Sequence, residues 1–145
     1  MVVRLERTVG ASPDAVWRLV SDPSRLAEWW PGVTRVEDAG ADAWTTVLTS
    51  PKGKAVRADY KLQERVEGTS VAWRQELAGS PFERILAEAL TRVELAGAGD
   101  GTRVVLTLTQ RPRGWARFSP MQLRAAARRQ AESALDGLGA VLEGR

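Results

Sequence analysis

The chain has 145 residues, 43% hydrophobic and 27% charged, with a formal net charge of +3 at pH 7. These values are typical of a globular protein, and we expect a single domain over residues 1–145. The sequence contains no cysteine and no histidine, which excludes disulfides, zinc–thiolate sites, thiol nucleophiles and histidine catalysis. We therefore expect neither a metal ion nor a cofactor, and the small net charge does not indicate a nucleic-acid partner.

The sequence shows no targeting or membrane-spanning segment. The first ten residues alternate between charged and aliphatic side chains, unlike the apolar run of a secretory signal peptide. No window approaches the roughly 18 consecutive apolar residues of a transmembrane helix. These observations predict a cytoplasmic protein without integral membrane contact.

The N-terminal part predicts one strand and two short helices. Residues 2–9 alternate between aliphatic and polar side chains, as in a strand with one buried face. Helices are expected over residues 12–21 and 22–32, because Ser12 and Asp22 are favourable N-caps and each is followed directly by proline. A Pro-Gly pair ends the second helix, so the two form a bent pair.

The middle of the chain predicts about six antiparallel strands, each with one apolar face. Residues 84–96 are ambiguous, because Ser80 and Glu83 resemble a helix start while the alternation over residues 91–95 favours a strand. We interpret them as a strand. The expected strands cover residues 34–39, 43–50, 55–66, 70–77, 84–96 and 102–110.

The chain is expected to end in one long helix, from residue 119 to about residue 143. Ser119 and Gln122 match a capping box, and Pro120 suits the first helical turn. A curved antiparallel sheet of about seven strands around this helix would bury every apolar face. The sequence therefore predicts an α+β fold with two short helices after the first strand.

Three features of the chain are distinctive: the segment SPDAVWRLVSDPSRLAEWWPGV, the segment GDGTRVVLTL and the long terminal helix. Together they resemble the START-like or SRPBCC superfamily, and its polyketide cyclase/dehydrase branch is the most similar. The resemblance implies a helix-grip (START/Bet v 1-like) fold whose sheet and helix enclose a deep, mostly apolar cavity. Members of the superfamily bind lipids, sterols, polyketides or plant hormones, or act as aromatases and cyclases, and a related branch activates a chaperone ATPase. Because the fold serves many functions, these motifs indicate the fold more strongly than the chemistry.

Strand alternation and helix periodicity predict which residues face such a cavity. Alanines on the inner face of the terminal helix, including Ala126 and Ala131, would leave room for a ligand. Each inward residue could instead be plain core or lie at a wet rim. The expected ligand contacts are Trp30, Val56, Ala58, Tyr60, Leu62, Trp73, Gln75, Leu106, Leu108, Gln110, Ala127, Gln130 and Ala134. The polar candidates on the inward faces are Tyr60, Glu64, Gln75, Gln110 and Gln130.

Two adjacent indoles, Trp29 and Trp30, stand at the end of the second short helix. Consecutive helical residues point about 100° apart, so the two side chains cannot share one environment. We expect Trp29 to be buried and Trp30 to lie at the cavity rim, where an amphipathic ring suits both surroundings.

Three functions compete at this point. The first is non-catalytic binding of a small hydrophobic or amphipathic ligand, such as a lipid, a polyketide or an aromatic compound. The second is a polyketide cyclase/dehydratase-like enzyme, with Glu64 as a general base whose pKa burial raises and Tyr60 as an acid or oxyanion donor. These two residues would share a strand face about 13 Å apart, too far to act on one small group.

The third function is a protein-interaction module of the chaperone-activator type, in which a basic surface including Arg124 and Arg128 contacts a partner. Seven arginines and no acidic residue lie between residues 103 and 129. They form either a solvated face or a basic entrance for an anionic ligand, a membrane surface or an acidic partner. No nucleic-acid partner is expected, and the protein is expected to be a monomer or a homodimer. The arginines are Arg103, Arg111, Arg113, Arg117, Arg124, Arg128 and Arg129.

Overall fold

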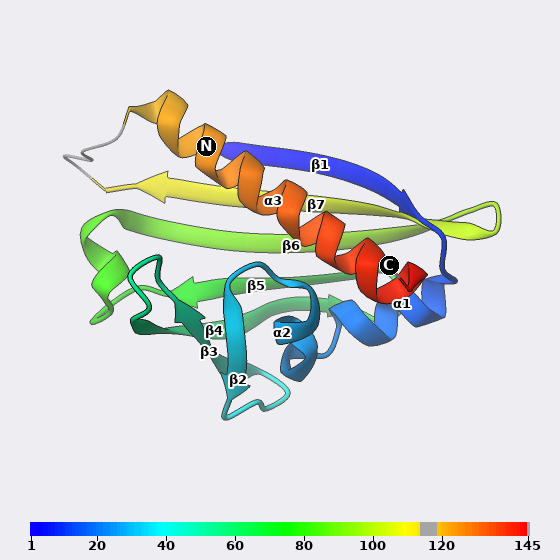
Figure 1. Ribbon diagram of the computed structural model, residues 1–145, viewed down its shortest axis with the longest axis horizontal. Helices are drawn as coiled ribbons and strands as arrows, with labels where there is room; N and C mark the ends of the chain where they lie inside the picture. The colour runs from blue at the N-terminus through cyan, green and yellow to red at the C-terminus, as the bar shows by residue number, and fades with distance from the viewer. Residues whose placement is uncertain (114–118, 145) are drawn as a thin grey trace.

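The computed structural model describes residues 1–113 and 119–144, which form a seven-stranded sheet crossed on one face by helices (Figure 1). The strands are β1 (Val2–Val9), β2 (Val33–Glu37), β3 (Ala43–Thr49), β4 (Ala55–Val66), β5 (Ser70–Glu76), β6 (Leu86–Ala98) and β7 (Gly101–Pro112). The helices are α1 (Pro13–Val20), α2 (Leu26–Trp29) and α3 (Pro120–Glu143), with 3₁₀ turns η1 (Pro23–Arg25) and η2 (Pro81–Arg84). The predicted α+β helix-grip architecture is confirmed.

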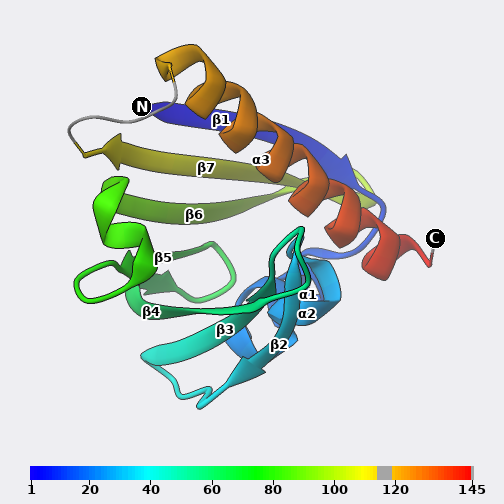
Figure 2. The same ribbon diagram turned by 60° about the vertical axis from the view of Figure 1, so that its left-hand side comes forward.

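The sheet is antiparallel throughout, and its strand order is β1-β7-β6-β5-β4-β3-β2. The strands from β2 to β7 form a meander, and β1 closes the opposite edge by pairing with β7. The sheet bends beneath α3: in Figure 2 it runs from β1, beside α3, down to β3 and β2 at the bottom of the view. The ambiguous segment at residues 84–96 belongs to β6, as predicted, and the helix-start signal at Ser80 yields only the short turn η2.

The helix α3 begins with the predicted capping box. The Ser119 hydroxyl accepts the backbone N–H of Gln122 at 3.1 Å, and the Gln122 side chain accepts the N–H of Ser119 at 2.9 Å. The exposed Ala126 falls outside the buried stripe, so its prediction as an inner residue is wrong; it lies one position, about 100°, from Ala127. The buried residues of α3 are Ala127, Ala131, Ala134, Leu135, Leu138 and Gly139.

The second predicted helix is shorter than its pattern indicated. Asp22 caps the 3₁₀ turn η1, and the single turn of α2 ends at Trp29. Trp30 is already extended, with φ −81° and ψ 129°. The two indoles therefore diverge because the backbone leaves the helix between them, rather than by helical phase.

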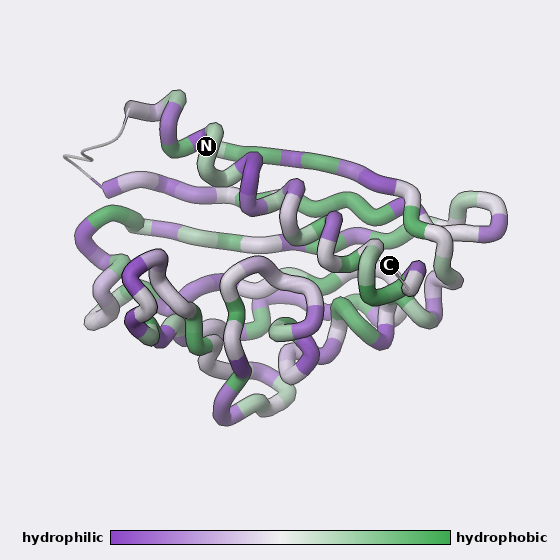
Figure 3. The backbone as a smooth tube through the Cα atoms, in the orientation of Figure 1, coloured by the Kyte–Doolittle hydropathy of each residue, from purple (hydrophilic) through white to green (hydrophobic). Residues whose placement is uncertain are grey.

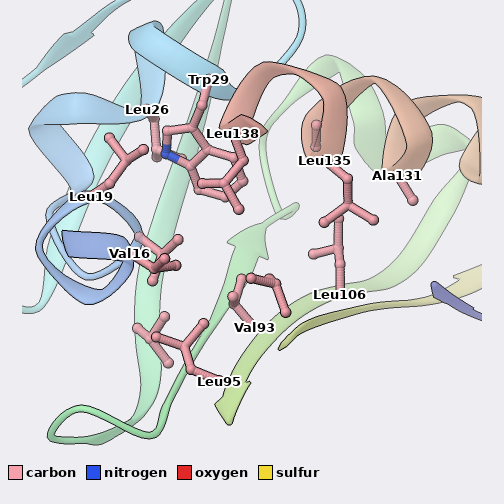
Figure 4. Packing of buried hydrophobic residues seen from close by; sticks show 14 of the residues in the cluster. Val16, Leu19, Leu26, Trp29, Val93, Leu95, Leu106, Ala131, Leu135 and Leu138 are labelled. Atoms are coloured by element: carbon pink, nitrogen blue, oxygen red, sulfur yellow. The ribbon is translucent and has the colours of Figure 1, made fainter. Parts of the chain in front are cut away.

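The hydrophobic core lies between the sheet, α1, α2 and the C-terminal half of α3 (Figure 4). The last turns of α3, the helix that contacts α2, are largely hydrophobic (Figure 3). Trp29 is 4% exposed and packs within this core, in agreement with its predicted burial. Over the described ranges, no helix is both long and apolar enough to cross a membrane.

Candidate functional site

A partly enclosed cavity of about 70 Å³ lies between the inner face of the sheet and α3. Strands β2 to β7 supply most of its wall, Leu26 and Trp30 come from the α2 segment, and Gln130 comes from α3. Apolar and aromatic side chains alternate with amides and hydroxyls, and none of the lining residues is charged. The complete lining is Leu26, Trp30, Val33, Thr46, Tyr60, Trp73, Gln75, Ala89, Leu90, Thr91, Leu108, Gln110 and Gln130.

The structure brings together part of the predicted ligand-contact set. Leu106, Ala58, Ala127 and Ala134 face inward but are fully packed in the core, and Leu62 borders a separate void of about 10 Å³. These positions share the correct face but lie where side chains fill the space between sheet and helices. The predicted residues in the cavity wall are Trp30, Tyr60, Trp73, Gln75, Leu108, Gln110 and Gln130. Those outside it are Val56, Ala58, Leu62, Leu106, Ala127 and Ala134.

Several wall residues escaped the sequence analysis. Thr46 pairs with Ala58 across β3 and β4, and Thr91 pairs with Leu108 across β6 and β7, so strand register places both on the inner face. Alternation along β3 and β6 could have identified them. Leu90 could not be found this way, because its position in the alternation belongs to the opposite face of the sheet. It reaches the cavity at the place where the pairing of β5 with β6 ends.

Aromatic rings form one side of the site. The Trp30 ring meets Trp73 edge to face at a centroid distance of 6.0 Å and meets Trp29 at 5.4 Å. The Trp44 ring stacks on Tyr60 at 6.1 Å and meets Trp73 edge to face at 6.1 Å. This continuous contact joins the buried Trp29 to the cavity wall and fixes the orientation of the lining rings.

Tyr60 is the titratable side chain of the cavity wall. Burial raises the pKa of its phenol above the ordinary value, and a hydrogen bond with Thr46 opposes this shift by a smaller amount. The phenol is therefore neutral at physiological pH and can donate a hydrogen bond.

We predict that the Tyr60 phenol ionises at a higher pH in the native protein than in denaturant. Because the folded state holds the proton more tightly, this contribution to stability is complete below the unfolded pKa of about 10 and is lost as pH rises through the folded pKa. Tyr60 is the only tyrosine, so phenolate absorbance reports this residue alone. Equal midpoints in buffer and in denaturant would contradict the burial described here.

Glu64 does not face the cavity, so its prediction as an inward general base is wrong. A β-bulge inserts Gln63 between the pairs Leu62–Trp73 and Glu64–Ala72, and a one-residue shift moves Glu64 to the opposite face. There its carboxylate accepts hydrogen bonds from Arg92 at 2.8 and 3.0 Å and from Ser70 at 3.3 Å. Arg92 holds the pKa of Glu64 below its usual range, opposite to the shift that a general base needs.

The predicted basic stretch is largely a solvated face. Arg103 pairs with Glu6 at 3.6 Å, Arg111 with Glu88 at 3.8 Å and Arg128 with Glu132 at 3.2 Å. Arg124 borders an open apolar groove at the start of α3, and Arg117 lies outside the described residues. Within residues 1–113 and 119–144, no cluster of acidic residues could hold a metal ion.

A family model described as "Polyketide cyclase / dehydrase and lipid transport" matches residues 1–143. The chain belongs to this family. The resemblance drawn from the WWPGV and GDGTRV segments is thereby confirmed. No curated protein matches the chain in sequence.

Three solved structures with a similar fold each cover 99% of this chain. A START superfamily protein from Mycobacterium smegmatis is 14% identical, with a TM-score of 0.80 over 99% of this chain and 97% of its own. The Zhui aromatase/cyclase from Streptomyces sp. R1128 is 20% identical, with a TM-score of 0.76 over 99% and 93%. The Aha1 dimer from Colwellia psychrerythraea is 17% identical, with a TM-score of 0.69 over 99% and 96%. At these identities the likeness shows a shared fold.

Proposed function

We propose that this protein binds a small hydrophobic or amphipathic molecule in the cavity between the sheet and α3. The observation that carries the proposal is the composition of the cavity wall, in which aromatic and aliphatic surfaces surround a few uncharged hydrogen-bonding groups. Ligand sites generally combine an apolar wall with a small number of placed polar groups. The membership in a family named for polyketide cyclisation and lipid transport supports the same class of ligand.

The polar groups of the wall specify what part of a ligand can enter. Gln75, Gln110 and Gln130 reach the cavity from β5, β7 and α3, so amide donors and acceptors lie on different sides. A carbonyl, ether or hydroxyl group can pair with such amides. A charged group would lose its hydration without gaining an opposite charge, so the buried part of the ligand is uncharged.

A second candidate function is a cyclase-like reaction, favoured by the position of Tyr60 in the cavity wall. A neutral phenol can donate a hydrogen bond to a substrate carbonyl as negative charge develops on its oxygen. The partner base predicted at Glu64 does not line the cavity, because the bulge at Gln63 turns that carboxylate outward. We therefore rank binding above catalysis; Tyr60→Phe would abolish a cyclase-like activity and leave binding of apolar ligands unchanged.

The binding proposal is tested by thermal-shift screening of neutral lipids and aromatic compounds, with native mass spectrometry to establish stoichiometry. A ligand present at 100 times its Kd should add about 2.7 kcal/mol to the free energy of unfolding. Thr91→Phe fills the cavity and should remove the shift, whereas Thr107→Phe makes the same change on the opposite face of the sheet and should retain it. Equal shifts in both variants would place the ligand elsewhere.

We further propose that the protein acts in the cytoplasm as a monomer or homodimer, without a metal or cofactor.

The interaction-module hypothesis also remains a prediction. Charge reversal at Arg124 and Arg128 should weaken capture of an acidic partner, and unchanged capture would count against it.

A further inference from the structure

The sheet splits between β5 and β6 beside the cavity. The ladder that joins these strands ends at the Arg74–Leu90 pair. Beyond it, Gln75 pairs only with Tyr60 of β4, and Ala89 pairs only with Gln110 of β7. The turn η2 spans the interval between the two separated strands (Figure 2).

A second, larger hollow lies directly outside this split. It has a volume of about 470 Å³ and is bordered by β5, β6 and the η2 segment. Gln75, Ala89 and Leu90 line both this outer groove and the inner cavity. These three residues therefore lie between the two spaces, and their strands are not joined by ladder pairs there except at Leu90.

The sizes of the two spaces indicate how they would be used. Small-molecule sites typically have volumes of about 300–1,000 Å³. The inner cavity, at about 70 Å³, holds only a compact group, whereas the outer groove has room for the rest of a ligand. A molecule that enters through the split would occupy both.

The charges of the outer groove favour an anionic group. The Glu76 carboxylate forms ion pairs with the Lys61 ammonium at 3.4 Å and with the Arg74 guanidinium at 3.6 Å. Glu88 has Arg111 at 3.8 Å, and Glu83 accepts the backbone N–H of Gly79 at 3.1 Å. Arg113 also lines this groove, and its guanidinium has no ion-pair partner among the described residues. Glu76 and Glu88 are thus paired with cations, whereas Glu83 makes only a backbone hydrogen bond within the described part of the chain. Counted with Lys61 and Arg111, the groove has four cations for three carboxylates, and the unpaired Arg113 is available to an anion.

We propose that the ligand is an amphipathic acid, with a compact uncharged end in the inner cavity and a carboxylate or similar anionic group beside Arg113 in the outer groove. The inference rests on the proposed function and adds the ligand's charge, its orientation and its route through the β5–β6 split. An exposed guanidinium–carboxylate pair is a weak interaction, so the loss of Arg113 should lower the affinity by a small but measurable factor.

Isothermal titration with ω-phenylhexanoic acid and ω-phenylhexanol tests this inference, since the two probes differ only in the terminal group. The wild-type protein should bind the acid more tightly. Arg113→Gln should weaken binding of the acid about two- to fivefold and leave the alcohol unchanged. Arg103→Gln, which removes the same charge from the far end of β7, should change neither.

The outcomes separate this inference from the binding proposal. Equal affinities for acid and alcohol, with no effect of Arg113→Gln, would overturn the inference and leave the proposed function in place. Failure of both probes to bind would count against the proposed function itself.

The route through the split is tested by Ala89→Trp, which narrows it. This variant should weaken binding of both probes at least about tenfold while retaining its circular dichroism spectrum, and unchanged binding would overturn the route. If Ala89→Trp loses that spectrum, the binding data of Arg113→Gln alone decide whether the inference stands.

Discussion

Replacing Trp29 by alanine is expected to lower the free energy of unfolding by about 3–5 kcal/mol. The indole is 4% exposed and packs in the core formed with Leu26 and Leu138 (Figure 4). Its Nε1–H has no hydrogen-bond partner among the described residues, so the loss comes from packing and cavity formation rather than from a broken hydrogen bond. Urea denaturation followed by circular dichroism measures the change.

Trp30→Ala is the matched control, because it removes the same side chain one residue later. Trp30 is only partly buried and lines the cavity, so its loss should destabilise the protein less and weaken ligand binding more. Equal losses of stability in the two variants would contradict the division into one indole for the core and one for the site.

Gly137→Ala is expected to destabilise the protein by about 1–3 kcal/mol, the range typical of overpacking. A Cβ atom at this position would lie 2.3 Å from the backbone oxygen of Trp29 and 3.1 Å from its carbonyl carbon. Helix α3 therefore approaches the backbone of α2 at a distance that only glycine permits. The close contact holds the Trp29–Trp30 segment against α3.

Helix propensity alone predicts the opposite sign for Gly137→Ala, because alanine is favoured over glycine by about 1 kcal/mol in a helix interior. Ser133→Ala, at an exposed position of the same helix, should be neutral or slightly stabilising and serves as the control. A stabilised Gly137→Ala variant would show that α2 and α3 are not in close contact. Thermal melting of both variants distinguishes the two results.

The fold could be predicted because its signals are local. The capping box of Ser119 and Gln122 predicts the start of α3. The strands are predicted by the alternation of apolar and polar side chains over six or more residues. The burial of Trp29 could also be predicted, although by an incomplete argument. The divergence of the two indoles arises from the extended backbone at Trp30, which the helical pattern did not show.

The site could be predicted only in part, because its geometry depends on irregularities in the sheet. The bulge at Gln63 moves Glu64 to the outer face, and alternation carries no signal for one inserted residue. The end of the β5–β6 ladder at Arg74–Leu90 creates the split and the outer groove, and ladder ends depend on tertiary packing. Packing also decides that Leu106 is core while Leu108, two residues along the same face, lines the cavity.

The most direct test of the central claim is an NMR titration of the tryptophan indole N–H signals with ω-phenylhexanol. Trp30 and Trp73 line the cavity, and their signals should shift and saturate together. The Trp17 indole donates a hydrogen bond to Glu67 at 3.0 Å and does not line the cavity, so its signal should stay in place. Single Trp→Phe variants assign the signals. A saturable shift confined to Trp30, Trp73 and their ring neighbours is the predicted result; binding that leaves both signals unmoved would contradict a ligand site between the sheet and α3.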